Sequence, residues 1–461
     1  MQKMLQQIPH EIVSTIIDHV DPKDLPACSL ISHAYRADVQ RKMFHTIWLD
    51  YSLFAQQSNI GIITYNLADA ATDKEFRRLP DIFKANPTLA SYVKCFNIVA
   101  SPPSSSFVNS EEGTNVLPRI LPFLSDLTNF SFTTANYNKK VPDYSSLTQD
   151  LQIAIEGVFK RNKNISNVEI IAAGSVPVDI FAHLSRIQSL TINSLIEPLI
   201  PGHPANPLPV ICPESLTLDT SIRDNRERFD GTISLLKENN GRKALLSFSE
   251  LTEFIVRCPN ATSQIMQSFL SYTNPERLLT LYIETCNDGA TAYERGTWTY
   301  LSGFNPDTYM PSFTLFMFHK LTTITVCDYV VPDSAERAGL CNFSWIAAIL
   351  DTLPSPITNA PSNLSLDLRI SVSQKFSVGE LSGLPLIFAP TINVINQKLS
   401  SGALKAACVV FTFTREGNES GVGEKWKYEV AQAFRKHGAI DSLWSERNES
   451  FIRPVSRTPW E

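Results

Sequence analysis

Residues 6–50 read "QQIPHEIVSTIIDHVDPKDLPACSLISHAYRADVQRKMFHTIWLD". Ile8, Ile12, Ile16 and Val20 recur there every four residues, a spacing that predicts one apolar face of a helix of about three turns. Further apolar residues stand directly beside these four and belong to the same face.

A second helix is predicted after the "DPKDL" turn. Asp21 suits a cap position and Pro22 the first helical position, where a missing N–H costs nothing. Apolar spacings of three and four then continue through Leu25, Cys28, Ile31, Tyr35 and Val39, with Ser32 as a cap between a second and a third helix. Phe44, Ile47, Trp48 and Leu49 close the segment. We therefore expect two or three short helices.

A helical unit of about 45 residues buries too little surface to be stable without a staple or a partner. The segment contains a single cysteine, Cys28, and no pattern of metal ligands. Each large apolar side chain left in water forgoes roughly 1.5–3 kcal/mol. The surplus apolar surface must therefore be covered by the rest of the chain or by another protein.

The segment resembles an F-box. The matching motifs are Ile8-Pro9, Glu11-Ile12, Ile16-Ile17, Asp21-Pro22-Lys23-Asp24-Leu25, Leu30-Ile31-Ser32 and Tyr35-Arg36, and "RKMFHTIWL" resembles the closing segment of fungal members. The resemblance implies docking onto a Skp-type adaptor and, through it, onto the cullin of a ubiquitin ligase. The residues expected to contact the adaptor are Ile8, Pro9, Ile12, Ile16, Leu25, Cys28, Leu30 and Ile31.

Two other interpretations of the segment remain open. It could be an ordinary helical cap on the domain that follows. It could also be a DNA-binding helix-turn-helix, whose recognition helix is basic and polar on one face. The candidate helix carries Arg36, Arg41 and Lys42, but it also carries Asp38 and an apolar stripe, which disfavours DNA binding.

Beyond residue 50, a strand-like run recurs with an apolar–x–x–apolar–x–apolar skeleton and is usually accompanied by a helix-like stretch. The clearest runs are "LTNFSF" (from Leu127), "ISNVEI" (from Ile165), "IQSLTI" (from Ile187), "LLTLYI" (from Leu278), "LTTITV" (from Leu321) and "PSNLSLDL" (from Pro361), with weaker copies in "ESLTLD", "ELTEFIV" and "ACVVFTF". Helix-like neighbours include "LQIAIEGVFKR", "SQIMQSFLSY", "PSFTLFMF" and "SWIAAILDTL".

This recurrence resembles a degenerate leucine-rich repeat, whose units run ~20–29 residues. The resemblance implies a curved parallel sheet with helices outside, each unit covering its neighbour. The fold class we expect is α/β: a small helical F-box at 1–50, then a leucine-rich-repeat-like solenoid at 51–461. A plain α/β domain would show the same local alternation. Segments rich in Pro, Ser or Gly predict loops at 100–115, 197–214 and 415–425.

Composition narrows the function classes. With 43% hydrophobic residues and a net charge of −6, the chain lacks the basic surplus of a nucleic-acid binder. No apolar run approaches the ~18 residues of a membrane helix, and the N-terminus lacks the apolar core of a secretory signal. We therefore expect no nucleic acid and no membrane as partners, and a cytoplasmic or nuclear location. The eight cysteines form no CxxC pair, which is typical of free thiols.

The motifs of catalysis are absent from the sequence. Nucleophile elbows, phosphate-binding glycine loops and HExxH pairs do not occur, so we expect no enzyme, no cofactor and no metal. The function implied is a substrate receptor of a cullin–RING (SCF-type) ubiquitin ligase with an unknown protein substrate. The alternatives are a non-catalytic scaffold without a ligase partner and an enzyme built on an α/β body. The aromatic-rich stretch from Tyr293 to Phe318 is either a recognition patch or part of the core.

Overall fold

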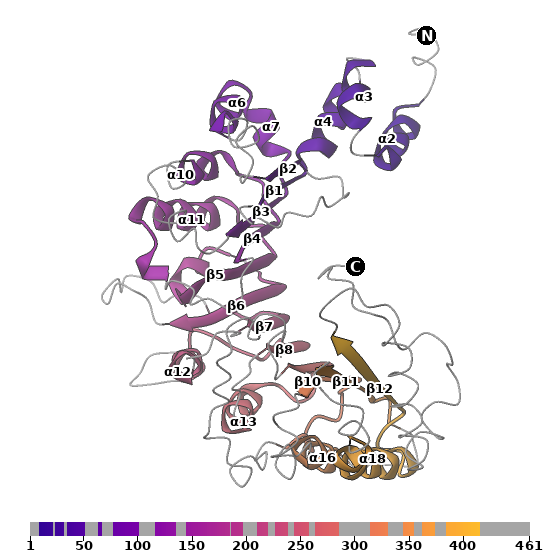
Figure 1. Ribbon diagram of the computed structural model, residues 1–461. Coiled ribbons are helices and arrows are strands. Elements are labelled where there is room, and N and C mark those ends of the chain that lie inside the picture. The colour runs from indigo at the N-terminus through magenta and orange to yellow at the C-terminus, as the bar shows by residue number, and fades with distance from the viewer. Residues whose placement is uncertain are drawn as a thin grey trace. The chain divides into compact units, whose positions relative to one another are not determined.

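The computed structural model describes residues 9–21, 24–31, 35–50, 63–66, 77–100, 116–134, 144–184, 186–196, 210–219, 226–237, 244–257, 263–284, 314–330, 344–354, 362–373 and 384–414. The chain divides into two compact units, Met1–Pro213 with Glu227–Leu246 and Glu214–Arg226 with Ser247–Glu461. Each unit contains parallel strands with helices along one face (Figure 1). The predicted α/β class with N-terminal helices is confirmed.

The first unit begins with three helices and continues as a parallel sheet. Its helices are α2 (His10–His19), α3 (Leu25–Ile31), α4 (Arg36–Phe44), α6 (Leu79–Ala85), α7 (Pro87–Ser91), α10 (Leu117–Ile120), α11 (Gln149–Arg161) and nearly all of α12 (Arg226–Leu235), with short 3-10 turns η2 (Leu121–Phe123), η3 (Tyr144–Ser146) and η4 (Val178–Phe181). Its strands are β1 (Thr46–Asp50), β2 (Ile63–Asn66), β3 (Cys95–Ala100), β4 (Asn129–Thr134), β5 (Asn167–Pro177) and β6 (Ser189–Ile196).

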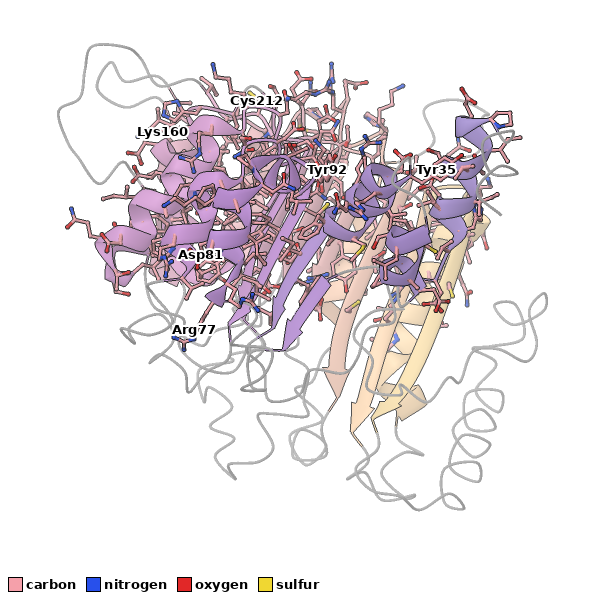
Figure 2. All side chains as sticks on the ribbon, turned by 90° about the horizontal axis from the view of Figure 1, so that it is seen from above. Tyr35, Arg77, Asp81, Tyr92, Lys160 and Cys212 are labelled. Carbon is pink, nitrogen blue, oxygen red and sulfur yellow. The ribbon has the colours of Figure 1, made fainter. Side chains whose placement is uncertain are left out.

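The order of these strands is β2-β1-β3-β4-β5-β6, so β1 lies between β2 and β3. From β3 to β6 the strands lie side by side in chain order. Figure 2 shows the aligned strands, with Asp81 of α6 and Lys160 of α11 on the helical layer. Sequential parallel strands joined through helices are the arrangement that stacked strand–helix units produce.

The second unit repeats this plan. Its strands follow chain order across the sheet: β7 (Ser215–Asp219), β8 (Glu253–Arg257), β9 (Thr280–Glu284), β10 (Thr323–Val330), β11 (Ser365–Ser373) and β12 (Ala406–Thr414). The helices α13 (Ser263–Tyr272), α16 (Ser344–Asp351) and α18 (Leu384–Ser400) lie on one side of them (Figure 1). Every strand-like run quoted from the sequence, the weaker copies included, falls on one of the strands β4 to β12.

Alternation along each strand decides what faces the helices. In β8 the second and fourth residues, Phe254 and Val256, are fully buried, whereas the first, third and fifth residues are partly exposed. Phe254 packs against Phe269 of α13 with ring centroids 5.7 Å apart, so the even positions form the core beneath the helices. Phe130 and Phe159 make the same strand-to-helix contact in the first unit, at 5.5 Å.

A backbone arrangement recurs just before many of the strands. The carbonyl of Lys94 accepts hydrogen bonds from the N–H groups of two consecutive residues, Thr128 at 2.8 Å and Asn129 at 3.0 Å. In the second unit the carbonyl of Thr252 does the same with Leu279 and Thr280. The carbonyls of His45, Thr128, Ser166, Glu214 and Leu279 show the arrangement as well. Repetition of one entry geometry indicates that successive strand–helix units share a common local structure.

Some of the sequence-based expectations need correction, and others concern residues that the structure does not describe. The stretch "PSFTLFMF" was expected to be helical, but its described part, residues 314–318, is irregular with a turn at residues 316–317. Residues 46–50 form strand β1, so the helical segment ends at Phe44. The predicted loop at 415–425 lies outside the described residues, as do the predicted loops at 100–115 and 197–214 apart from Ala100 and residues 210–214. The division into a helical domain at 1–50 and a repeat body at 51–461 stays a prediction.

Candidate protein-docking interface

Helices α2, α3 and α4 form a small helical head with a core of its own. Val13, Ile17, Leu25 and Val39 are buried together, with exposed fractions between 1% and 8%. The side chains of Val20, Cys28, Tyr35 and Met43 are partly buried and pack against this cluster. All three helices contribute to the cluster, so each contributes one apolar face to the interior of the head.

A second set of apolar side chains points away from this core. Ile12 and Ile16 lie one turn apart on α2 and are 51% and 54% exposed, and Leu30 at the end of α3 is 80% exposed. We call these three side chains the apolar ridge. Burying them fully in a partner would contribute on the order of 3–5 kcal/mol, taking their exposed fractions into account. The head therefore carries an uncovered apolar surface in addition to its core.

The ridge borders a shallow open groove on α2. Thr15, Ile16, His19 and Val20 line this groove. The hydroxyl of Thr15 donates to the carbonyl of Glu11 at 2.8 Å, and His19 Nδ1 lies 2.8 Å from the carbonyl of Thr15. Polar side chains beside the groove are thus engaged with their own helix. An open, mostly apolar hollow of this kind suits contact with a protein surface better than enclosure of a small molecule.

Lys42 of α4 forms hydrogen bonds with the backbone at the C-terminal end of α2. Its ammonium group donates to the carbonyls of Ile17 at 2.6 Å and Val20 at 3.1 Å. The last carbonyls of a helix lack intrahelical partners and lie at the negative end of its dipole, so a cation there is favourable. Since α2 carries Ile12 and Ile16, Lys42 helps to fix the direction in which the ridge points. A spacing of more than 20 residues between lysine and carbonyls gives no sequence signal for this contact.

Helix α4 also joins the head to the sheet. It runs into β1 with only His45 between them. The guanidinium of Arg41 lies over the ring of Tyr92 with 5.5 Å from Cζ to the centroid, and Phe44 meets Phe83 edge-on at 6.3 Å. Figure 2 labels Tyr92 together with Tyr35 at the start of α4. The head is therefore packed against the first helices of the sheet rather than hanging from a free linker.

The structure brings some of the predicted contact residues to the surface and not others. Pro9, Ile12, Ile16 and Leu30 are exposed. Leu25 is 1% exposed and belongs to the core of the head, and Cys28 packs against that core. Ile8 and the side chain of Ile31 lie outside the described residues. In this structure Leu25 holds the helices together, and its contact with an adaptor stays a prediction.

The part of the chain that the structure describes holds no group of three or more His, Cys, Asp or Glu residues that could bind a metal ion. Among those residues, no helix has both the length and the apolar character needed to span a bilayer.

In the aromatic-rich stretch, Leu315 and Phe318 are buried whereas Phe316 and Met317 are more than half exposed, and residues 293–313 lie outside the description.

The geometry thus defines a class: a helical protein-docking module fused to parallel strand–helix units. Comparison with known families agrees with this class, since the family model of the F-box domain matches residues 5–37, which span α2, α3 and the start of α4. The match supports an F-box protein, and F-box domains in general bind Skp-type adaptors. A search of curated proteins found no match to this chain.

Proposed function

We propose that this chain is the substrate receptor of a cullin–RING (SCF-type) ubiquitin ligase. The head would bind a Skp-type adaptor, which connects it to the cullin, and the body would hold a protein substrate. The observation that carries this proposal is the apolar ridge. Ile12, Ile16 and Leu30 remain exposed inside the F-box match although the head has a separate core.

The body is proposed to be a leucine-rich-repeat-like solenoid. Sequential parallel strands, helices on one side and a recurring strand entry support this assignment. In this role the chain performs no bond chemistry. It holds substrate lysines near the charged ubiquitin-conjugating enzyme and so raises their effective concentration. A cytoplasmic or nuclear location accompanies the proposal.

The test replaces two ridge residues in the full-length chain. Ile12→Asp with Leu30→Asp places carboxylates on the ridge, where contact with an apolar partner would desolvate them at high cost. We expect capture of a recombinant Skp-type adaptor to be lost. The matched control is Ile153→Asp with Phe316→Asp, since those side chains are 57% and 56% exposed and lie outside the head.

The control variant should retain the adaptor, and both variants should keep the circular dichroism spectrum of the parent. Retention of the adaptor by the ridge variant would contradict the proposal. A non-catalytic scaffold with an F-box-like cap is the alternative function. It would be favoured if the unmodified full-length chain failed to capture any Skp-type adaptor.

A further inference from the structure

The second unit has a sheet face on which none of its described helices lies. The even positions of β8 and β9 lie beneath α13, as the contact of Phe254 with Phe269 shows, so the odd positions point to the opposite side. These odd positions carry charge on four of the strands. We call them the charged face: Asp219, Glu253, Arg257, Glu284, Asp367 and Arg369.

Ion pairs hold the charged face in one arrangement. Asp219, Arg257 and Glu284 are register partners on β7, β8 and β9, and the guanidinium lies 3.5 Å from Asp219 and 3.4 Å from Glu284. Burial alone would lower the pKa of Arg257, but the two carboxylates outweigh it and raise the pKa. Arg257 is therefore shared between two acids.

Hydrogen bonds from neighbouring side chains also position Glu284, Glu253 and Asp367. The hydroxyl of Tyr282 donates to Glu284 at 3.0 Å, and the hydroxyl of Ser215 donates to Glu253 at 2.6 Å. Asp367 accepts two hydrogen bonds from Arg369, at 2.9 and 2.7 Å. Side chains that are already ordered lose little further entropy when a partner binds. The charged face is thus preorganised for recognition.

The fold does not demand these charges. The fifth strand positions show the difference: in β7, β8, β9 and β11 they are the charged residues Asp219, Arg257, Glu284 and Arg369, whereas in β3, β4, β5 and β6 of the first unit they are the neutral residues Val99, Thr133, Ile171 and Asn193. Ion pairs with a largely buried member, such as Asp219 with 4% exposure, contribute little net stability compared with neutral side chains of similar size. Stability therefore does not explain why these strands carry charged residues, whereas a role in binding does.

From this arrangement we infer that the charged face binds a lysine- and arginine-rich extended segment of a partner protein. Four carboxylates against two guanidinium groups leave a net charge of −2 on this face. A net negative field attracts cationic segments within about 10 Å at ordinary salt. This inference rests on the proposed function, in which the body of the chain holds the substrate. It adds the chemical class of that substrate, a basic segment of a protein.

Geometry suggests how such a segment is spaced. Glu284 and Asp367 stand on β9 and β11, two strands apart and two residues out of register, which corresponds to about 12 Å. An extended chain advances about 3.3 Å per residue, so basic residues three positions apart are separated by about 10 Å. Because lysine side chains are long and flexible, a peptide with lysine at every third position can reach both carboxylates.

The test uses the full-length chain and two synthetic peptides. One has lysine at every third position among Gly and Ser, and its twin has glutamate at those positions. Fluorescence anisotropy measures binding of each peptide. We expect Glu284→Gln and Asp367→Asn each to weaken binding of the lysine peptide about two- to fivefold, and Arg369→Gln to strengthen it by a similar factor. Glu169→Gln is the matched control, since Glu169 accepts from Ser131 as Glu253 does from Ser215.

The control should bind the lysine peptide as the parent does. If Glu284→Gln and Asp367→Asn behave like the control, or if the glutamate peptide binds more tightly, the inference is overturned. Adaptor capture is measured on the same variants and should not change. If the parent chain fails to capture the adaptor but binds the lysine peptide, the proposed function is overturned and the inference about the charged face is not.

Discussion

Asn162 at the end of α11 makes side-chain hydrogen bonds to three backbone groups of the first unit. The side chain is 2% exposed, its Oδ1 accepts from the N–H of Leu127 at 2.8 Å, and its Nδ2 donates to the carbonyls of Leu124 at 2.9 Å and Val158 at 2.8 Å. The carbonyl of Val158 also accepts the N–H of Asn162 itself. Asn162 therefore ties the turn before β4 to the helix after it.

Replacement of Asn162 by Ala removes the partners of two buried backbone groups, the N–H of Leu127 and the carbonyl of Leu124. A buried polar group left without its hydrogen bond costs roughly 1–3 kcal/mol, so we expect the free energy of unfolding to fall by about 2–5 kcal/mol. Val158 keeps one donor and adds little to the loss. The measurement is urea denaturation of the full-length chain, followed by circular dichroism.

Asn164→Ala serves as the control, since Asn164 lies two residues further along and is exposed. Its effect should stay within about 0.5 kcal/mol, as is usual for surface substitutions. Hydrogen exchange should also accelerate around residues 124–134 in Asn162→Ala alone. A loss below about 1 kcal/mol would refute the reasoning, because it would mean that water or relaxation replaces the side chain's hydrogen bonds.

Two further predictions concern Lys42 in the head and Cys327 on β10. Lys42→Met keeps an apolar stem but leaves the carbonyls of Ile17 and Val20 without their cation, so amide exchange in α2 should accelerate several-fold by mass spectrometry, and Lys42→Arg should restore much of the protection. Unchanged exchange in Lys42→Met would contradict the tethering role. Burial, together with the charges nearby, raises the pKa of the Cys327 thiol to about 11, so its alkylation should still accelerate between pH 9 and 10.5, beyond the range of an ordinary thiol. Alkylation that levels off by pH 9 would show that this thiol is not perturbed.

Much of the sheet could be predicted from the sequence because alternation is a local signal. In "LLTLYI" the apolar residues Leu281 and Ile283 alternate with Thr280 and Tyr282, and the structure buries the first two beneath the helices. Strand β1 was missed for a physical reason. Ile47 and Leu49 alternate as well, but they follow α4 with a single residue between, so the pattern was interpreted as the end of a helical segment.

The turn from residue 314 was also misinterpreted. Leu315, Phe318 and Leu321 recur every three residues and are all buried, a spacing that indicates a helix. In the structure these three side chains are buried although the segment is not helical. The backbone N–H groups of residues 314 and 315 donate hydrogen bonds to the side chains of Gln267 and Thr352. Long-range side-chain partners of this kind are invisible in a sequence window.

The candidate interface was predictable in kind but not in detail. The helical segment has more apolar side chains than a unit of its size can bury, which indicates that some of them need an outside partner, and Ile12 and Ile16 are indeed exposed. Periodicity does not tell which apolar residues the head buries in its own core, so the sequence could not show that Leu25 is buried there. The charged face was not predicted, because its residues come from strands that lie far apart in the sequence and meet only through parallel register.

The way in which the head meets the sheet bears on how a receptor of this kind would work. A receptor that performs no chemistry acts by position, since effective concentration depends on where the bound groups are held. Arg41 and Phe44 pack against Tyr92 and Phe83, and only His45 separates α4 from β1. Under the proposed function, an adaptor seated on the ridge would therefore have a fixed direction relative to the first strands. A flexible linker would spread the same groups over a larger volume and lower that concentration.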